Sequence, residues 1–329
     1  MRRYKSGWKV LALLGALGLS ATASAEGVLT LKVENDLFAS SDDGHYTSGV
    51  ELGWTFAAEP SHWSQQVARW VPNFLLDEVD GVSYRFTHEI YTPDDINRRE
   101  LIEDDRPYAG VLLLGLSLHE DKRIDQWRQA SDLHFDVGVV GPGARAEQLQ
   151  REVHRITNSD NPRGWEHQLS NEPVINATYR RQWWYGHRLG GLTLEHGPSV
   201  TGAVGNLYTY AGGGYGMRLG EGLQRSYGTP AVSPAQGGRQ YFTTGDRFGW
   251  YAFASLEGRY MAQNMLLDGN TFTSSHSVDK RNEVGDALVG AALTWQRWQL
   301  SYTHVWRTRE FHGQDGTDSF GSMTVSRHF

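Results

Sequence analysis

The sequence contains no cysteine and no long apolar run, and these two absences exclude a disulfide-stabilised fold and a helical membrane protein. Without cysteine, no disulfide can hold the fold together. No segment beyond the N-terminus reaches the ~18 consecutive apolar residues of a transmembrane helix. The most apolar run, residues 111–118, has the length of a strand. The formal charge of −7 gives no reason to expect a nucleic-acid partner.

The first 25 residues have the composition of a cleaved secretory signal peptide. They combine a basic start, a short apolar stretch at residues 10–19 and the small-residue site Ala23-Ser24-Ala25. The apolar stretch is too short to span a membrane as a helix. We therefore expect the mature chain to begin near Glu26 and residues 26–329 to form one exported domain.

Aromatic residues and glycine are abundant in this exported chain, with 12 Trp, 15 Tyr, 12 Phe and 38 Gly. Two classes of protein fit that composition in the absence of a spanning helix. One is a soluble all-β protein. The other is a bacterial outer-membrane β-barrel, whose strands alternate apolar and polar residues and carry aromatic girdles.

Apolar and polar residues alternate in many segments, which is the period of a half-buried strand. In residues 298–309, for example, Trp298, Leu300 and Tyr302 alternate with Gln299 and Ser301. Twelve segments read as strands: 29–34, 49–57, 82–91, 108–118, 133–139, 173–184, 188–200, 206–218, 248–262, 283–295, 298–309 and 319–329. The predicted fold is all-β, a twelve-stranded antiparallel transmembrane β-barrel, because single-chain bacterial barrels have an even strand number.

Two segments have helical spacing instead. Residues 144–156 carry Leu149, Val153 and Ile156 on one side, which predicts a short helix in an outer loop. Residues 60–80 carry aromatic and aliphatic residues at similar spacing and predict a second short amphipathic helix.

Trp298 and Trp306 lie eight residues apart on one strand face. This is ~20 Å along the membrane normal for a tilted strand, near the height of the apolar band.

The strand count also predicts which connections face outward. With both termini in the periplasm, residues 37–45, 92–107, 142–170, 201–205, 263–280 and 310–317 form the outer loops. The inner connections are then 58–81, 120–130, 185–187, 220–246 and 296–297. The shortest turns, 185–187 and 296–297, fall on the periplasmic side, where barrels have short turns. Connections 58–81 and 220–246 are longer than this rule expects.

The predicted outer loops and outer strand ends contain a set of polar residues: Asn35, Asp36, Thr47, Arg98, His154 and Asp160. A histidine among such groups can serve acid–base catalysis. Each residue alone also has a structural explanation. Asn35 and Asp36 suit a hairpin tip, His154 suits a solvated helix surface, and Asp160 suits a helix end. Arg98 could contact a lipopolysaccharide phosphate. The G-x-S-x-G and H-E-x-x-H motifs of serine hydrolases and zincins are missing.

An ordered set of motifs resembles the outer-membrane lipid A 3′-O-deacylase family, LpxR. The motifs are ENDLF, HYTSG, HEIYTPDDINRRE, DRPYAG, GVVGPGARAEQLQREVHRI and GW-x-x-QLSNEP. The similarity covers nearly the whole mature chain and is densest from residue 34 to residue 173.

The resemblance implies a twelve-stranded barrel whose active site lies between the wall and a helix of an outer loop. It implies that His154 is a general base that activates water and that Ca²⁺ stabilises the oxyanion. It further implies that Asn35 and Asp36 form the family's Asn-Asp pair, with Thr47 as the site threonine. Asp36 and Asp160 are the expected calcium ligands. Arg98 stands where the family has a lysine and presents a planar fork instead of a compact ammonium.

The resulting hypothesis is a calcium-dependent ester hydrolase in the outer membrane that removes the 3′-linked acyloxyacyl group of lipid A. Lipopolysaccharide and outer-membrane lipids are the expected partners, and we expect a monomer. Basic residues such as Arg98, Arg99 and Arg106 are expected to contact phosphates. Two alternatives remain open at this point. One is a porin-like or structural barrel without catalysis, and the other is an outer-membrane phospholipase A.

Overall fold

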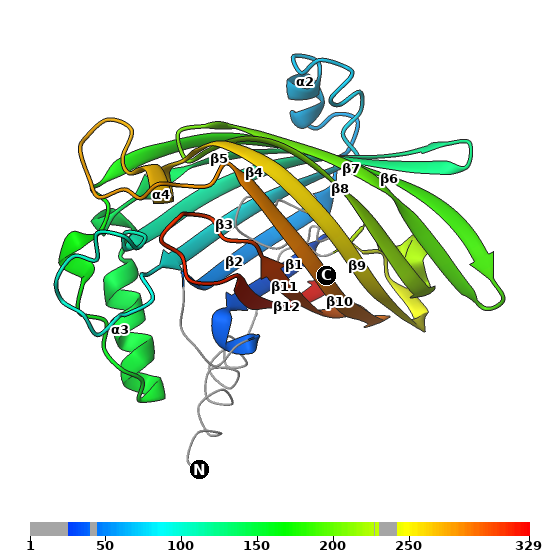
Figure 1. The fold of residues 1–329 in the computed structure, drawn as a ribbon. Helices are drawn as coiled ribbons and strands as arrows, with labels where there is room; N and C mark the ends of the chain where they lie inside the picture. Colours follow the sequence, from blue (N-terminus) through cyan, green and yellow to red (C-terminus); the bar gives the residue numbers. More distant parts are fainter. Residues whose placement is uncertain (1–25, 40–44, 227, 230–241) are drawn as a thin grey trace, which may run out of the picture.

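The computed structural model describes residues 26–329 except 40–44, 227 and 230–241 (Figure 1). The expected signal peptide, residues 1–25, lies outside the described residues. None of the described helices is long and apolar enough to cross a membrane.

Twelve antiparallel strands close into a barrel in which each strand pairs with the next and β1 pairs with β12. The all-β, twelve-stranded prediction is confirmed. The strands are β1 Val28–Asn35, β2 Tyr46–Ala57, β3 Gly81–Tyr91, β4 Ala109–Ile124, β5 Trp127–Val140, β6 Glu172–Leu189, β7 Leu192–Gly205, β8 Tyr208–Glu221, β9 Gly245–Asn264, β10 Glu283–Gln296, β11 Trp298–Arg307 and β12 Asp318–His328.

Short helices occupy the connections. One rim carries η1 Asp36–Phe38, η2 Pro142–Ala144, α3 Ala146–Thr157, η3 Trp165–His167 and α4 Met265–Asp268. The other carries the start of β1, the end of β12, α2 Ser64–Ala68 and η4 Leu223–Arg225. The connections β4–β5, β6–β7 and β10–β11 have two, two and one residues, and all three lie on this second rim. Because short turns are periplasmic in such barrels, we call this the inner rim and the α3 side the outer rim.

The inside of the barrel is filled by ion pairs that are shielded from water. Asp286 is bound by Arg307 at 2.8 Å and by Arg259 at 2.9 Å. Lys32 lies 3.7 Å from Glu34 and 3.8 Å from Glu51. A buried charge is tolerated only with such partners, so these strands keep one polar face throughout.

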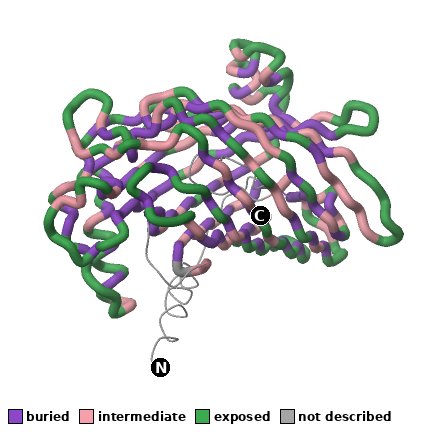
Figure 2. The backbone as a smooth tube through the Cα atoms, viewed as in Figure 1, coloured by how far each residue is buried: buried purple, intermediate pink, exposed green. Residues whose placement is uncertain are grey.

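The outside of the barrel carries exposed apolar side chains, and buried and exposed residues alternate along the strands (Figure 2). Trp298, Leu300, Tyr302 and Trp306 on β11 are each 38–44% exposed, whereas Ser301 and Thr303 between them are buried. An apolar outer surface and a polar interior are the arrangement expected of a wall in contact with lipid.

Three predicted connections were placed wrongly. The turn expected at residues 185–187 lies inside β6, and the chain turns at Gly190 and Gly191. Gly190 has φ +64°, a conformation that glycine adopts without strain. Strand β7 consequently runs to Gly205, so no loop exists at residues 201–205. Residues 120–130 form the ends of β4 and β5 around a two-residue turn at Asp125 and Gln126 instead of a polar loop.

The helix expected within residues 60–80 is only one turn long, α2 Ser64–Ala68. The predicted helix at 144–156 is present as α3, Ala146–Thr157, in an outer loop as expected. The inner connections at 58–80 and 222–244 are long, as the sequence indicated, and the inner turn next to Gln296 is short.

Candidate active site

Asn35 and Asp36 stand where β1 reaches the outer rim. Along β1, the buried residues Thr30, Lys32 and Glu34 face the lumen, so Asn35 belongs to the outward-facing set. Its side-chain amide donates to the carbonyl of Thr47 at 2.7 Å. Asp36 begins η1 and is 2% exposed. The Asn-Asp pair is thereby attached to the neighbouring strand β2.

Thr47 lies at an irregularity in β2. The register with β3 shifts between Tyr46, which pairs with Tyr91, and Ser48, which pairs with Ile90. The extra residue is Thr47, whose hydroxyl lies 2.8 Å from that of Thr92 just beyond β3. Bulges of this kind redirect a side chain out of the regular alternation. Here the bulge joins the ends of β2 and β3 through two buried hydroxyls.

Helix α3 lies against the outside of β3 and β4. A Cβ atom added to Gly110 of β4 would come within 2.4 Å of the Cβ of Ala146 at the start of α3. The Nε2 atom of His88, on the outward face of β3, lies 2.9 Å from the carbonyl oxygen of Ala144. Only glycine at position 110 allows the helix to approach the wall this closely.

The buried side of α3 consists of Ala146, Gln150 and His154, at a spacing of four residues. Gln150 accepts a hydrogen bond from the indole Nε1 of Trp165 at 2.8 Å. The apolar side that defined the helix in the sequence is exposed instead, with Leu149 43% and Val153 40% exposed. Because the helix sits outside the barrel, its apolar side faces away from the protein.

His154 is held in one orientation by the loop that follows its helix. Its ring nitrogen Nδ1 makes a short hydrogen bond with the backbone carbonyl of Asp160. A carbonyl only accepts, so Nδ1 carries the proton and the lone pair of the neutral ring is on Nε2. The side chain is 7% exposed, and no described residue is bonded to Nε2. The carboxylate of Asp160 belongs to an exposed residue.

The two groups of candidate residues share one rim and one face of the wall. Asn35 pairs with Ser48, Ser48 with Ile90, and Ile90 with Gly110, on which α3 rests. Three strand spacings separate Asn35 from Gly110, or about 14 Å. His154 stands eight residues after Ala146, about 12 Å along the helix. The bonds of Asn35 and Thr47 run to β2 and to Thr92, and that of His154 runs to Asp160.

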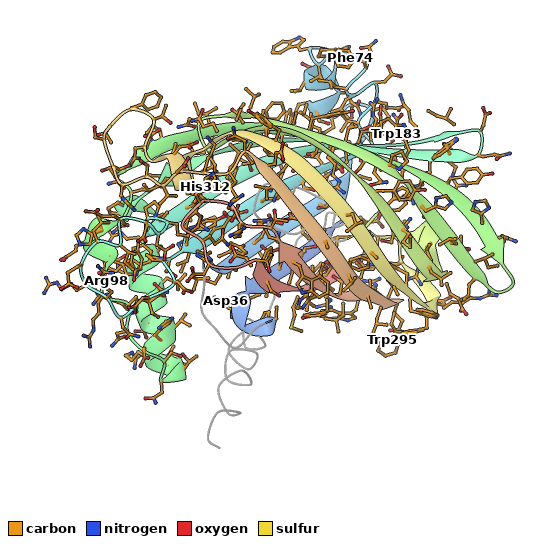
Figure 3. All side chains as sticks on the ribbon, in the orientation of Figure 1. Asp36, Phe74, Arg98, Trp183, Trp295 and His312 are labelled. Atoms are coloured by element: carbon orange, nitrogen blue, oxygen red, sulfur yellow. The ribbon has the colours of Figure 1, made fainter. Side chains whose placement is uncertain are left out.

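The three arginines proposed for phosphate binding differ in exposure. Arg98 is exposed in the loop after β3 (Figure 3). Arg99 is also exposed but is paired with Glu166 at 3.2 Å. The expectation that Arg106 contacts a phosphate is wrong: it is 1% exposed, and its guanidinium lies over the ring of Tyr91, 4.7 Å from the centroid.

The donor set around Asp36 suits a hard cation. Asn35 precedes it in the chain and is bonded to Thr47, which is bonded to Thr92, and these residues carry the amide, carbonyl and hydroxyl oxygens that Ca²⁺ prefers as ligands. Among the described residues, which exclude 40–44, no three His, Cys, Asp or Glu side chains are grouped as a metal cluster. An ion here would therefore need carbonyl, amide or hydroxyl oxygens in addition to one or two carboxylates, and calcium accepts all of these.

His45 is a site-rim residue that the sequence did not identify. Its Nδ1 lies 2.6 Å from Asp318 and its Nε2 lies 3.5 Å from Asp105, so it joins three outer segments. Burial alone lowers the pKa of His45, but the bonds to Asp105 and Asp318 outweigh it and raise the pKa to about 9. Burial raises the pKa of Asp105, and the bonds from His45 and the Asp94 amide outweigh it and lower the pKa.

Comparison with known proteins identifies the family. A sequence model described as "Outer membrane protein LpxR" matches residues 10–329. The chain belongs to the LpxR family of outer-membrane proteins. No curated protein matches it. The solved structure of LpxR from Salmonella typhimurium has the same fold, with a TM-score of 0.74 and 22% identity over 92% of this chain and 100% of that one. The β domain of the Bordetella autotransporter BrkA is 10% identical, with a TM-score of 0.48 over 93% of this chain and 100% of that one.

The contact between Gly110 and α3 generates a prediction for this LpxR-family barrel. Gly110→Ala places a methyl group 2.4 Å from the Ala146 Cβ, so α3 must move away from the wall. Trypsin should then cleave after Arg151 or Arg155 several-fold faster in folded protein. The control is Gly258→Ala, because an added Cβ there meets nothing within 4 Å. Unchanged cleavage of Gly110→Ala would show that the contact does not position the helix.

The raised pKa of His45 generates a second prediction. The folded pKa of about 9 exceeds the ordinary ~6.5 of the unfolded chain. Protonated His45 therefore stabilises the fold fully below ~pH 6.5, and this contribution is lost as the pH rises through 9. His45→Gln should lower the unfolding midpoint at pH 6 and have little effect at pH 10. His312→Gln, at a 56% exposed side chain of the same rim, should have little effect at either pH.

Proposed function

We propose that this protein is a lipid A 3′-O-deacylase: a calcium-dependent ester hydrolase that removes the 3′-linked acyloxyacyl group in the outer leaflet. The observation that carries the proposal is His154, whose protonated Nδ1 is fixed by a carbonyl while its Nε2 has no partner among the described residues. It lies on the outside of the barrel, where a lipid substrate would be found. Membership of the LpxR family supports the same reaction class.

His154 would act as the general base. Its Nε2 takes a proton from a water molecule as the water oxygen attacks the ester carbonyl carbon. The carbon–oxygen bond to the sugar then breaks, and the imidazolium returns the proton to the leaving 3′-oxygen. The products are a carboxylic acid and a free hydroxyl group. The bond from Nδ1 to Asp160 stabilises the imidazolium as it forms, because that nitrogen keeps its acceptor throughout.

Asp36 and Asp160 are the proposed calcium ligands, one from each group of candidate residues. The bound ion would act as a Lewis acid that stabilises the negative charge on the ester oxygen. Asn35 holds the rim in place through Thr47, which in turn bonds Thr92. Arg98 is exposed and would contact a phosphate of the substrate, which its planar fork suits well.

An apolar belt below α3 provides a path for the acyl chains. Phe86, Leu114 and Val137 pair across β3, β4 and β5 and are 45%, 61% and 51% exposed on the outside of the wall. Leu114 lies four residues from Gly110, about 10 Å deeper in the membrane for a tilted strand. Acyl chains lying in the bilayer can therefore contact this belt while their ester reaches the helix.

The low solvent exposure of the charged residues in the lumen favours the proposed enzyme over a porin-like channel. Glu34, Asp286 and Arg307 have side chains that are 0–1% exposed. An open aqueous channel would leave its charged lining accessible to water. No observation favours the phospholipase alternative, which differs from the proposed enzyme in its substrate and not in its chemistry.

Replacing the proposed base tests the mechanism. His154→Gln should reduce lipid A deacylation at least about 100-fold, the usual contribution of a general base. His167→Gln, at a 35% exposed side chain of the same loop, should leave activity within twofold. Mass spectrometry of lipid A measures both, and heat-modifiability on gels reports a folded barrel. Near-normal activity of His154→Gln would disprove the proposed base, and undiminished wild-type activity in excess chelator would disprove the calcium requirement.

The acyl path generates a separate prediction. Leu114→Ser should lower deacylation several-fold at limiting substrate because it removes apolar contact beside α3. Leu256→Ser is the matched control, since Leu256 is 67% exposed on β9, away from α3. Both substitutions should lower the stability of the barrel by a similar amount. A difference in deacylation between the two variants would therefore report on the acyl path. Equal activity in the two variants would rule out the β3–β5 belt as the acyl path.

A further inference from the structure

The connection between β2 and β3, residues 58–80, folds back onto the outside of the wall instead of closing the inner rim. Its Leu76 and Val79 are buried in one cluster with Val82, Leu118 and Leu133. The last three pair across β3, β4 and β5. They alternate with lumen-facing residues and so belong to the outward face.

Hydrogen bonds attach the same connection to the outside of β6. The carbonyl of Leu75 accepts from the Tyr179 hydroxyl at 3.1 Å and from the Arg181 guanidinium at 2.9 Å. Arg180 between them points into the lumen, where it binds Glu257 at 2.7 Å. Tyr179 and Arg181 therefore face outward, and Leu75 covers the membrane side of the wall. We call residues 58–80 the lateral arm.

The lateral arm presents large apolar side chains that touch little of the protein. Trp70 is 88% exposed, Phe74 71% and Trp63 40%. In Figures 1 and 3, α2 projects from the side of the barrel and Phe74 lies on this projection, away from the wall. Burying an aromatic side chain removes 150–250 Å² from water, so these rings gain substantially if an apolar medium covers them.

The arm and a pair of exposed tryptophans belong to the same rim, because the β2–β3 and β10–β11 connections both lie at the inner ends of the strands. Trp295 and Trp298 flank the β10–β11 turn on that rim and are 57% and 44% exposed. Aromatic rings at both ends of a barrel wall occupy the boundary between headgroups and acyl chains. The arm thus adds exposed aromatic rings to this rim, and exposed Arg69 beside Trp70 offers a cation for lipid phosphates.

We propose that the lateral arm is a membrane anchor that inserts Trp63, Trp70 and Phe74 into the inner-leaflet interface among phospholipids. The arm holds the barrel at a fixed depth and rotation below the β3–β5 wall, on the side where α3 lies. Amphipathic elements that lie in the interface combine Trp, Phe or Leu on one face with Lys or Arg on the polar side, and the arm exposes residues of both kinds.

The absence of cysteine makes a direct test possible, because a single introduced cysteine is the only thiol. Trp70→Cys and Phe74→Cys, each spin-labelled, are reconstituted in phosphatidylethanolamine–phosphatidylglycerol bilayers. Collision rates with oxygen and with a water-soluble nickel chelate are then compared. Gly191→Cys in an exposed inner turn is the aqueous reference, and Leu256→Cys on the wall is the lipid reference.

The oxygen-to-nickel ratio at positions 70 and 74 should exceed that of Gly191→Cys several-fold and approach that of Leu256→Cys. Ratios equal to the aqueous reference at both positions would overturn the proposal. Both positions are exposed, and either one carries the test if the other variant fails to refold. Deacylase activity does not enter the readout, so the anchor and the proposed reaction can fail independently.

Discussion

Closure of the sheet is the constraint on which the rest of the structure depends. Every strand is bonded on both sides, so each residue must face either the lumen or the surroundings. The lumen is occupied by buried ion pairs such as Arg307 with Asp286. A helix added to this barrel can therefore pack only on the outside, as α3 does against Gly110. The location of the candidate active site at a lipid surface follows from the filled interior.

Strand number, strand type and sidedness could be predicted from the sequence because alternation is a local property. The misplaced turn shows the limit. The predicted turn at residues 185–187 follows the aromatic run Trp183-Trp184, but β6 continues through it to Leu189. The pair Gly190 and Gly191 was the available signal, since two-residue hairpin turns favour glycine. Polar residues within strands that extend past the bilayer cannot be told from loop residues by composition.

The candidate residues could be predicted individually, but their contacts could not. The motifs pointed to His154 and Asp160, yet it is the main chain of Asp160 that holds the ring. Thr47 acquires its position from a bulge, which depends on the register of two strands. His45 contacts Asp105 and Asp318, which lie 60 and 273 residues further along the chain. No local sequence pattern predicts contacts between residues so far apart. Each of these features depends on contacts that form only in the folded protein.

The seam between the first and last strands has a consequence for biogenesis. Thr30 meets Ser326 at 2.9 Å, and the amide of Phe329 donates to the carbonyl of Gly27 at 2.8 Å. Until the eleven residues of β12 pair with it, β1 has an unpaired edge that can template aggregation. The chain therefore needs protection from aggregation until these two strands have paired. A chain that lacks β12 would leave both β1 and β11 without a neighbour, so the sheet would stay open.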